Sequence, residues 1–175
     1  MPAAEAAAPL QALVNAGAEA VDTPALAASA EVLISMLGDD AAIRAVFLDA
    51  GAMDGLAPGS VHVNMSTVSV ALARDMAALH KARGVGYVSA PVLGRVDVAA
   101  AGNLNILASG AGEALARVQP LFDVLGRKTW PFGEDAERAC VAKLSANLMI
   151  AAASTGLPLS AVSFQYMLTS SAVMS

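Results

Sequence analysis

Lys143 and Asn147 lie four residues apart in a stretch whose pattern predicts a helix, 136–153, so their side chains share one helix face. A lysine amine can accept and return a proton when its pKa is lowered, and burial lowers it because desolvation disfavours the ammonium form. The residues on either side of Lys143 are apolar, which suits such burial. The Asn147 amide could hydrogen-bond the same reacting oxygen or hold the amine. The pair is a candidate for proton transfer, although the same spacing also occurs on solvated helix faces.

The rest of the chain must position this pair. Helical and extended stretches alternate at the spacing of βα units, which predicts a parallel sheet covered by helices. The strands are too apolar to alternate cleanly, as expected when both faces are covered. The predicted strands are 31–37, 61–65, 85–89, 104–109 and 127–132. The predicted helices are 3–16, 41–48, 69–83, 96–101, 112–125 and 136–153.

Hydroxyl and loop motifs follow three of these strands. Ser66-Thr67 stands between a strand and a helix, where its hydroxyls could cap the free amides of the helix start. Met36-Leu37-Gly38 closes the preceding strand, and Asp39-Asp40 opens the next helix as an acidic pair that suits the helix dipole. A further loop reads Ser89-Ala-Pro-Val-Leu-Gly-Arg95.

Taken in chain order, Met65-Ser-Thr67, the loop 89–95, Ala99-Ala-Ala-Gly102 and the Lys143/Asn147 pair resemble the β-hydroxyacid dehydrogenase family. The likeness extends from about Leu10 to Ala153 and includes the NADP-binding domain of 6-phosphogluconate dehydrogenase. It implies a Rossmann-like fold and NADP or NAD as cofactor. It also implies an NAD(P)-dependent oxidoreductase of the 3-hydroxyisobutyrate dehydrogenase-like type, which moves a hydride between nicotinamide and a small hydroxy acid or its aldehyde.

The resemblance assigns roles to individual residues. Lys143 would be the acid/base and Asn147 its partner, while Ser66 and Thr67 would lie against the nicotinamide. Met36, Leu37 and Gly38 match a Met-Leu-Pro segment in which the backbone passes the cofactor. Gly38 replaces the proline, so this loop is expected to be less rigid.

The substrate-binding loop implied by the resemblance comprises Pro91, Val92, Leu93, Gly94 and Arg95. In the better-known enzymes the matching loop reads Asp-Ala-Pro-Val-Ser-Gly-Gly, and its serine and glycines hold the substrate carboxylate. Leu93 has no hydroxyl, so that contact is lost, while Arg95 could bind a carboxylate in a bidentate manner if it points inward. An outward, solvated Arg95 is the open alternative. Imine reductases share the fold but usually lack the catalytic lysine, so the lysine argues against that activity.

A dinucleotide-binding domain usually opens with a G-x-G-x-x-G turn that holds the pyrophosphate, and this sequence contains none. Gly84-Val85-Gly86 and Gly110-Ala111-Gly112 are predicted to be ordinary turns. Compared with the family, the chain is expected to lack the first βαβ unit and the C-terminal all-helical domain. We therefore expect a partial dinucleotide-binding domain at 1–153 and an uncharged tail at 154–175. The alternative to an active enzyme is a truncated, catalytically inactive remnant that binds no cofactor and at most associates with a partner.

Composition limits the partners. The 175 residues carry a formal net charge of −5 with no cluster of Lys or Arg, which argues against nucleic acid. A single cysteine, Cys140, excludes an internal disulfide and is expected to be a small buried residue, and the absence of a signal sequence predicts a cytoplasmic protein. His62 and His80 have no partner at ligand spacing, so we expect structural roles and no metal site.

The sequence is uncharged from Leu144 to Ser175. Gly156-Leu157-Pro158 and the many polar residues argue against a membrane span. We expect 144–153 to be the buried start of an interdomain helix. The apolar segment beyond it is expected to be exposed, which favours a homo-oligomer.

Overall fold

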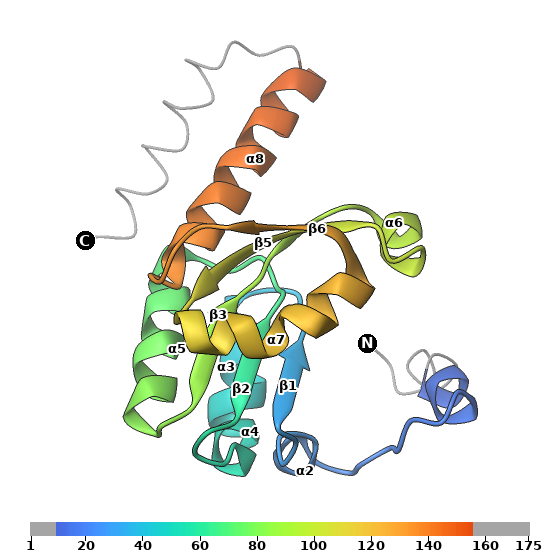
Figure 1. Cartoon of the computed structure of the whole chain (residues 1–175), viewed down its shortest axis with the longest axis vertical. Helices are drawn as coiled ribbons and strands as arrows, with labels where there is room; N and C mark the ends of the chain where they lie inside the picture. The colour runs from blue at the N-terminus through green and yellow to red at the C-terminus, as the bar shows by residue number, and fades with distance from the viewer. Residues whose placement is uncertain (1–9, 156–175) are drawn as a thin grey trace.

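The computed structural model describes residues 10–155, which form one six-stranded sheet covered by helices (Figure 1). The strand order is β1-β2-β3-β5-β4, and β6 pairs with β5. The strands are β1 (Val32–Ser35), β2 (Val61–Asn64), β3 (Gly86–Ser89), β4 (Val92–Leu93), β5 (Leu104–Gly110) and β6 (Gly126–Pro131). The helices are α2 (Pro24–Ala27), α3 (Asp40–Arg44), the π-helical turn η1 (Ala45–Asp49), α4 (Ala52–Gly55), α5 (Val70–Ala82), α6 (Val96–Ala100), α7 (Gly112–Leu125) and α8 (Glu137–Thr155).

The predicted α/β, Rossmann-like architecture is confirmed, but the sheet is mixed. β1, β2 and β3 are parallel, and so are β5 and β6. β5 runs antiparallel to both β3 and β4. Between β3 and β5 the chain passes through β4 and α6, and it returns beside β3 without a crossover helix over the sheet, which an antiparallel neighbour does not need. The prediction of a parallel sheet did not include this reversal, the short helices α2 and α4, or the two-residue strand β4.

Two hydrophobic clusters cover the two faces of the sheet. In one cluster, Phe47, Leu72 and Met76 from the helices η1 and α5 pack on the sheet, each at most 1% exposed. In the other, Val118 and Phe122 of α7 pack against the opposite face and are at most 1% exposed. All four residues of β2 are buried, as predicted for a strand covered on both faces.

Side-chain hydrogen bonds cap the N-termini of the helices that follow β1 and β2. Asp39 caps α3 by accepting a hydrogen bond from the Ala42 amide at 2.8 Å, as the acidic pair predicted. The N-cap of α5 is Ser69, whose hydroxyl accepts from the Leu72 amide at 3.1 Å. The prediction that Ser66-Thr67 caps this helix is therefore wrong, because the helix starts too late for either hydroxyl to reach its free amides.

The start of α8 is tied to the end of β5. The Ser109 hydroxyl donates to the Ala136 carbonyl at 2.8 Å and accepts from the Ala139 amide at 3.1 Å. Figure 1 shows α8 extending away from the sheet on the side of the carboxyl end of β1.

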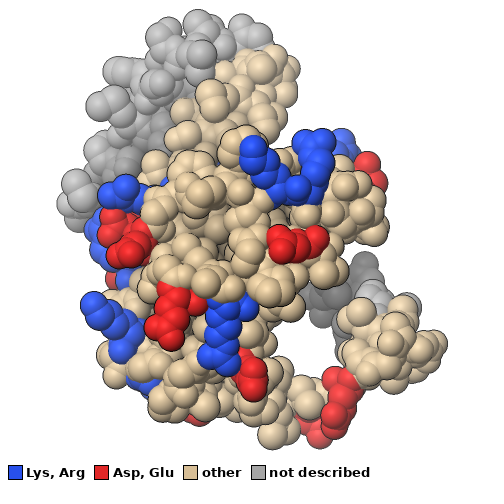
Figure 2. All heavy atoms as spheres, in the orientation of Figure 1, with Lys and Arg blue, Asp and Glu red and all other residues tan. Residues whose placement is uncertain are grey.

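The far part of α8 was predicted to be buried, and this is wrong. Met149 and Ile150 are 56% and 59% exposed, and of the positions described between 144 and 153 only Ala152 is buried. The described chain places no other element over this part of the helix, and its visible surface carries no charge (Figure 2). No helix within 10–155 is long and apolar enough to cross a bilayer.

Predictions at the two ends are tested only in part. The helix predicted at 3–16 is helical at 10–15, and Gly17 follows with a φ of 101°. Residues 1–9 and 156–175, which include most of the predicted tail, lie outside the described part of the chain.

Candidate active site

Three loops follow the carboxyl ends of the parallel strands β1, β2 and β3, and we call this region of the sheet the loop edge. The parallel register aligns Ser35 with Asn64 and Asn64 with Ser89, the last residues of β1, β2 and β3. The segments that follow are 36–38, 65–67 and 90–95, which contain ten of the twelve predicted site residues. Because parallel strands that end level deliver their loops to the same place, the fold brings these segments together.

Ser66 joins the first two loops. Its hydroxyl accepts a hydrogen bond from the Leu37 amide at 2.7 Å, and its own amide donates to Asn64 Oδ1 at 3.0 Å. Ser66 is 1% exposed, whereas the neighbouring Thr67 is exposed. Thr67 is therefore the hydroxyl of this pair that is open to a ligand.

The first loop is open as well. Met36 is 64% exposed, and a Cβ built on Gly38 would meet no atom within 4 Å. Leu37 between them is half-buried against the cluster that contains Phe47. The backbone of this loop is thus anchored by Leu37 and accessible on both sides of it.

Helix α8 approaches the same edge through Cys140. Its Sγ lies 3.2 Å from the Ser89 hydroxyl, within hydrogen-bonding distance, and Cys140 packs in one cluster with Val68. As expected, Cys140 is buried, and burial raises the pKa of its thiol. Lys143 follows about one helical turn later on the same helix.

Lys143 has the properties expected of a proton-transfer lysine. It is half-buried, and desolvation lowers the pKa of its amine. Among the described residues it makes no hydrogen bond or ion pair. Asn147 lies on α8 one turn further along and is exposed, so its amide is free to contact a ligand.

The third loop is buried at its start and exposed at its end. Pro91 and Val92 are buried, and Leu93 is half-buried in β4, paired with β5. Gly94 has a φ of 151°, and a Cβ there would lie 2.8 Å from a side-chain carbon of β5. Arg95 is exposed and makes no ion pair within the described chain, which favours the outward alternative for its side chain.

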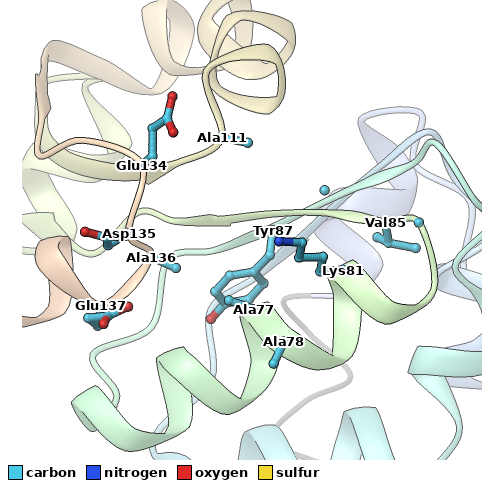
Figure 3. A pocket seen from close by; sticks show the side chains of 12 residues that line it. Ala77, Ala78, Lys81, Val85, Tyr87, Ala111, Glu134, Asp135, Ala136 and Glu137 are labelled. Carbon is cyan, nitrogen blue, oxygen red and sulfur yellow. The ribbon is translucent and has the colours of Figure 1, made fainter.

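A pocket of about 600 Å³ lies elsewhere, between α5 and the segment that joins β6 to α8 (Figure 3). Its lining includes Lys81, Tyr87 and Glu134–Glu137, and none of the predicted site residues. It opens at the start of β3, away from the three loops. Within 10–155 no three His, Cys, Asp or Glu side chains are arranged to hold a metal ion.

The two histidines form a feature that the sequence did not reveal. His62 and His80 are fully buried, stack at 4.9 Å between ring centroids and lie 3.0 Å apart at His62 Nδ1 and His80 Nε2. The expectation of structural roles gave no hint that they touch, because one lies on a strand and the other on a helix. Only their three-dimensional pairing shows that they belong to one hydrogen-bonded chain.

The model for the NAD-binding domain of 6-phosphogluconate dehydrogenase matches residues 4–142. The chain belongs to this family. The resemblance predicted from the loop motifs is thereby confirmed.

Curated relatives are oxidoreductases. The chain is 42% identical over 140 residues to the uncharacterized oxidoreductase YfjR of Bacillus subtilis, covering 79% of this chain and 49% of that protein. It is 36% identical over 147 residues to an NAD-dependent L-serine dehydrogenase of Pseudomonas aeruginosa, covering 81% and 49%. The chain thus spans about half the length of these relatives.

Solved structures show the same fold. A Mycobacterium tuberculosis 3-hydroxyisobutyrate dehydrogenase with L-serine aligns at a TM-score of 0.66 and 28% identity, over 77% of this chain and 50% of that one. Psf3 in complex with NADP+ and 2-OPP aligns at a TM-score of 0.74 and 25% identity, over 87% and 59%. An NAD-dependent relative and a structure in complex with NADP+ therefore both occur among similar proteins, consistent with the predicted choice of NADP or NAD.

In this NAD-binding domain, the predicted cofactor-binding residues present exposed groups at the carboxyl ends of β1 and β2. Thr67, Met36 and the space above Gly38 are exposed at one edge, and Ser66 fixes the backbone between them. A glycine-rich turn for the pyrophosphate does not occur in the 175-residue sequence. The roles of the individual site residues remain predictions.

Proposed function

We propose that this chain forms the nicotinamide side of an NAD(P)-dependent oxidoreductase site that acts on a small hydroxy acid or its aldehyde. The observation that carries the proposal is Lys143. Its amine is half-buried, has a lowered pKa and lies on α8 beyond the contact between Cys140 and Ser89. An amine in this state is suited to general acid/base catalysis.

The proposed reaction consists of a hydride transfer and a proton transfer. A bound nicotinamide supplies the hydride acceptor or donor. Lys143 Nζ takes the proton of the substrate hydroxyl during oxidation and returns it during reduction. The exposed Asn147 amide hydrogen-bonds the reacting oxygen or the amine, and the Thr67 hydroxyl faces the nicotinamide.

The substrate is proposed to be small because the first part of the substrate-binding loop, 91–93, is closely packed. Pro91 and Val92 are buried and Leu93 is half-buried, so little room remains beside them. Leu93 offers no hydroxyl for a carboxylate, and the exposed Arg95 would have to turn inward to replace that contact. Relatives named for L-serine and 3-hydroxyisobutyrate indicate which compounds to try first.

The second candidate is a remnant that binds no cofactor. Two observations favour it: the sequence holds no glycine-rich phosphate turn, and Ile34 of the edge strand β1 is 43% exposed. Such a chain would at most associate with a partner, and the exposed Met149 and Ile150 of α8 would supply the contact.

Turnover distinguishes the two candidates. The unaltered chain, Lys143→Met and Lys81→Met are assayed with L-serine and 3-hydroxyisobutyrate by the absorbance of reduced NAD and NADP. Lys81 is an exposed lysine on α5 and serves as the matched control. We expect Lys143→Met to lower kcat by about 10²-fold or more, as for loss of an acid/base, and Lys81→Met to have no effect. Activity in Lys143→Met equal to that of the control would refute the proposed role.

A further inference from the structure

A chain of buried hydrogen bonds lies next to the loops 36–38 and 65–67. Starting from α5, it links the Met76 carbonyl to His80 Nδ1 at 2.6 Å and His80 Nε2 to His62 Nδ1 at 3.0 Å. It continues from His62 Nε2 to the Ser35 hydroxyl at 2.8 Å. His80 lies on α5, His62 lies within β2, and Ser35 is the last residue of β1.

The positions of the protons follow from the first link. A carbonyl only accepts hydrogen bonds, so His80 Nδ1 carries a hydrogen. Desolvation by burial lowers the pKa of both rings, and each is therefore neutral with one N–H. His80 Nε2 is then an acceptor, His62 Nδ1 is the donor to it, and His62 Nε2 accepts the hydroxyl proton of Ser35.

This assignment determines what Asn64 can do. Asn64 Oδ1 lies 3.4 Å from the Ser35 hydroxyl, but the single proton of Ser35 is directed to His62 at the shorter distance. Asn64 Oδ1 is thus left to accept from the Ser66 amide at 3.0 Å, while Asn64 Nδ2 donates to the Tyr87 hydroxyl at 3.0 Å. The oriented Ser66 in turn holds the Leu37 amide.

The rings themselves are held in place. Phe47 stacks on His62 at 4.2 Å between ring centroids, and His62 stacks on His80. Ser35, Asn64 and Ser66 are at most 8% exposed, and within the described chain no buried side-chain polar atom lacks a partner. A fully satisfied buried network of this kind favours one arrangement of the groups attached to it.

We propose that Ser35, His62 and Asn64 are positioning residues, which direct one hydroxyl proton toward His62 and so hold the Ser66–Leu37 hydrogen bond between the two loops facing the nicotinamide. The inference rests on the proposed function, because it treats 36–38 and 65–67 as cofactor-binding loops. It assigns these buried residues a role in the geometry of the site in addition to their packing.

The test uses His62→Phe and Ser35→Ala. His62→Phe retains a ring against Phe47 and removes both hydrogen bonds of His62, whereas Ser35→Ala removes the hydroxyl that His62 is proposed to direct. Ser60→Ala is the matched control. Ser60 is also buried and donates a 2.6 Å hydrogen bond, but it precedes the amino end of β2, far from the loops that follow the carboxyl ends.

Amide hydrogen exchange and NADH titration are measured on all variants. In His62→Phe the Ser35 hydroxyl loses its acceptor on His62 and is free to donate to Asn64 Oδ1. We therefore expect the Leu37 and Ser66 amides of this variant to exchange about tenfold faster relative to the Val63 amide, and the Kd for NADH to rise by a similar factor. Ser35→Ala removes the competing hydroxyl, so it should change neither quantity. Ser60→Ala should change neither. Exchange in His62→Phe that matches the control, faster exchange with an unchanged Kd, or equally fast exchange in Ser35→Ala would overturn the inference. Absence of NADH binding by the unaltered chain would instead refute the proposed function, and the exchange rates would still decide whether the network holds the loops.

Discussion

The buried histidine pair predicts a loss of stability in mild acid. His80 has its pKa lowered from 6.5 to about 4, first by desolvation and further by Arg83, against the opposing hydrogen bond to the Met76 carbonyl. His62 is shifted in the same direction by burial and by His80. A ring that must stay neutral in the folded chain binds a proton only on unfolding, so acid favours the unfolded state.

The pH range of the stability loss and its magnitude follow from these pKa shifts. The unfolded chain takes up protons below pH 6.5, while the folded His80 stays neutral down to about pH 4. Stability is therefore complete above about pH 7 and falls as the pH drops toward 4. Between pH 7.5 and pH 5, His80 alone accounts for about 2 kcal/mol, at roughly 1.4 kcal/mol per pH unit below 6.5, and His62 adds to this loss.

Urea unfolding at a series of pH values measures this loss. The sequence contains only two histidines, so few other groups titrate between pH 5 and 7.5. The double variant His62→Phe/His80→Leu is the comparison, and its free energy of unfolding should vary much less with pH, whatever its absolute value. An unaltered chain that is as stable at pH 5 as at pH 7.5 would refute the argument that the two rings are buried and neutral.

Three further predictions concern single positions. Gly110→Ala should lower the free energy of unfolding by about 2 kcal/mol or more, because the φ is 153° and the new Cβ would lie 2.7 Å from a β3 carbonyl. Gly112→Ala, with nothing within 4 Å, is its control, and equal stability of the two variants would contradict the prediction. Ser69→Ala should cost about 1 kcal/mol in urea unfolding through loss of the α5 cap, and no loss relative to Ser29→Ala would show that the cap is not needed. Since burial lowers the pKa of Lys143, alcohol oxidation should rise with pH through a midpoint below 10.5, and a rate independent of pH from 7 to 10.5 would argue against this base.

Much of the fold could be predicted because its elements are long or strongly apolar. α5, α7 and α8 begin or end within one or two residues of their predicted bounds, and β2 and β3 lie inside the predicted strands. The direction of β5 was not predictable in this way. It depends on the two-residue strand β4, which is too short to leave a periodic pattern.

In the site, too, features set by local sequence could be predicted, whereas contacts between distant residues could not. The order of the loop motifs led to the family, and the level ends of β1 to β3 bring the predicted loops to one edge. The separate roles of Ser66 and Thr67 required the structure, because Ser66 is fixed by Leu37, 29 residues earlier. The contact between His62 and His80 likewise joins a strand to a helix and leaves no sequence pattern.

Cofactor titration tests the central claim most directly, since the claim is that this edge of the sheet binds nicotinamide. The folded 175-residue chain, Thr67→Val and the control Thr129→Val are titrated with NADH and NADPH and followed by reduced-nicotinamide fluorescence. The account predicts saturable binding in the micromolar range that Thr67→Val weakens and Thr129→Val leaves unchanged. A folded chain that binds neither cofactor up to millimolar concentration would contradict it.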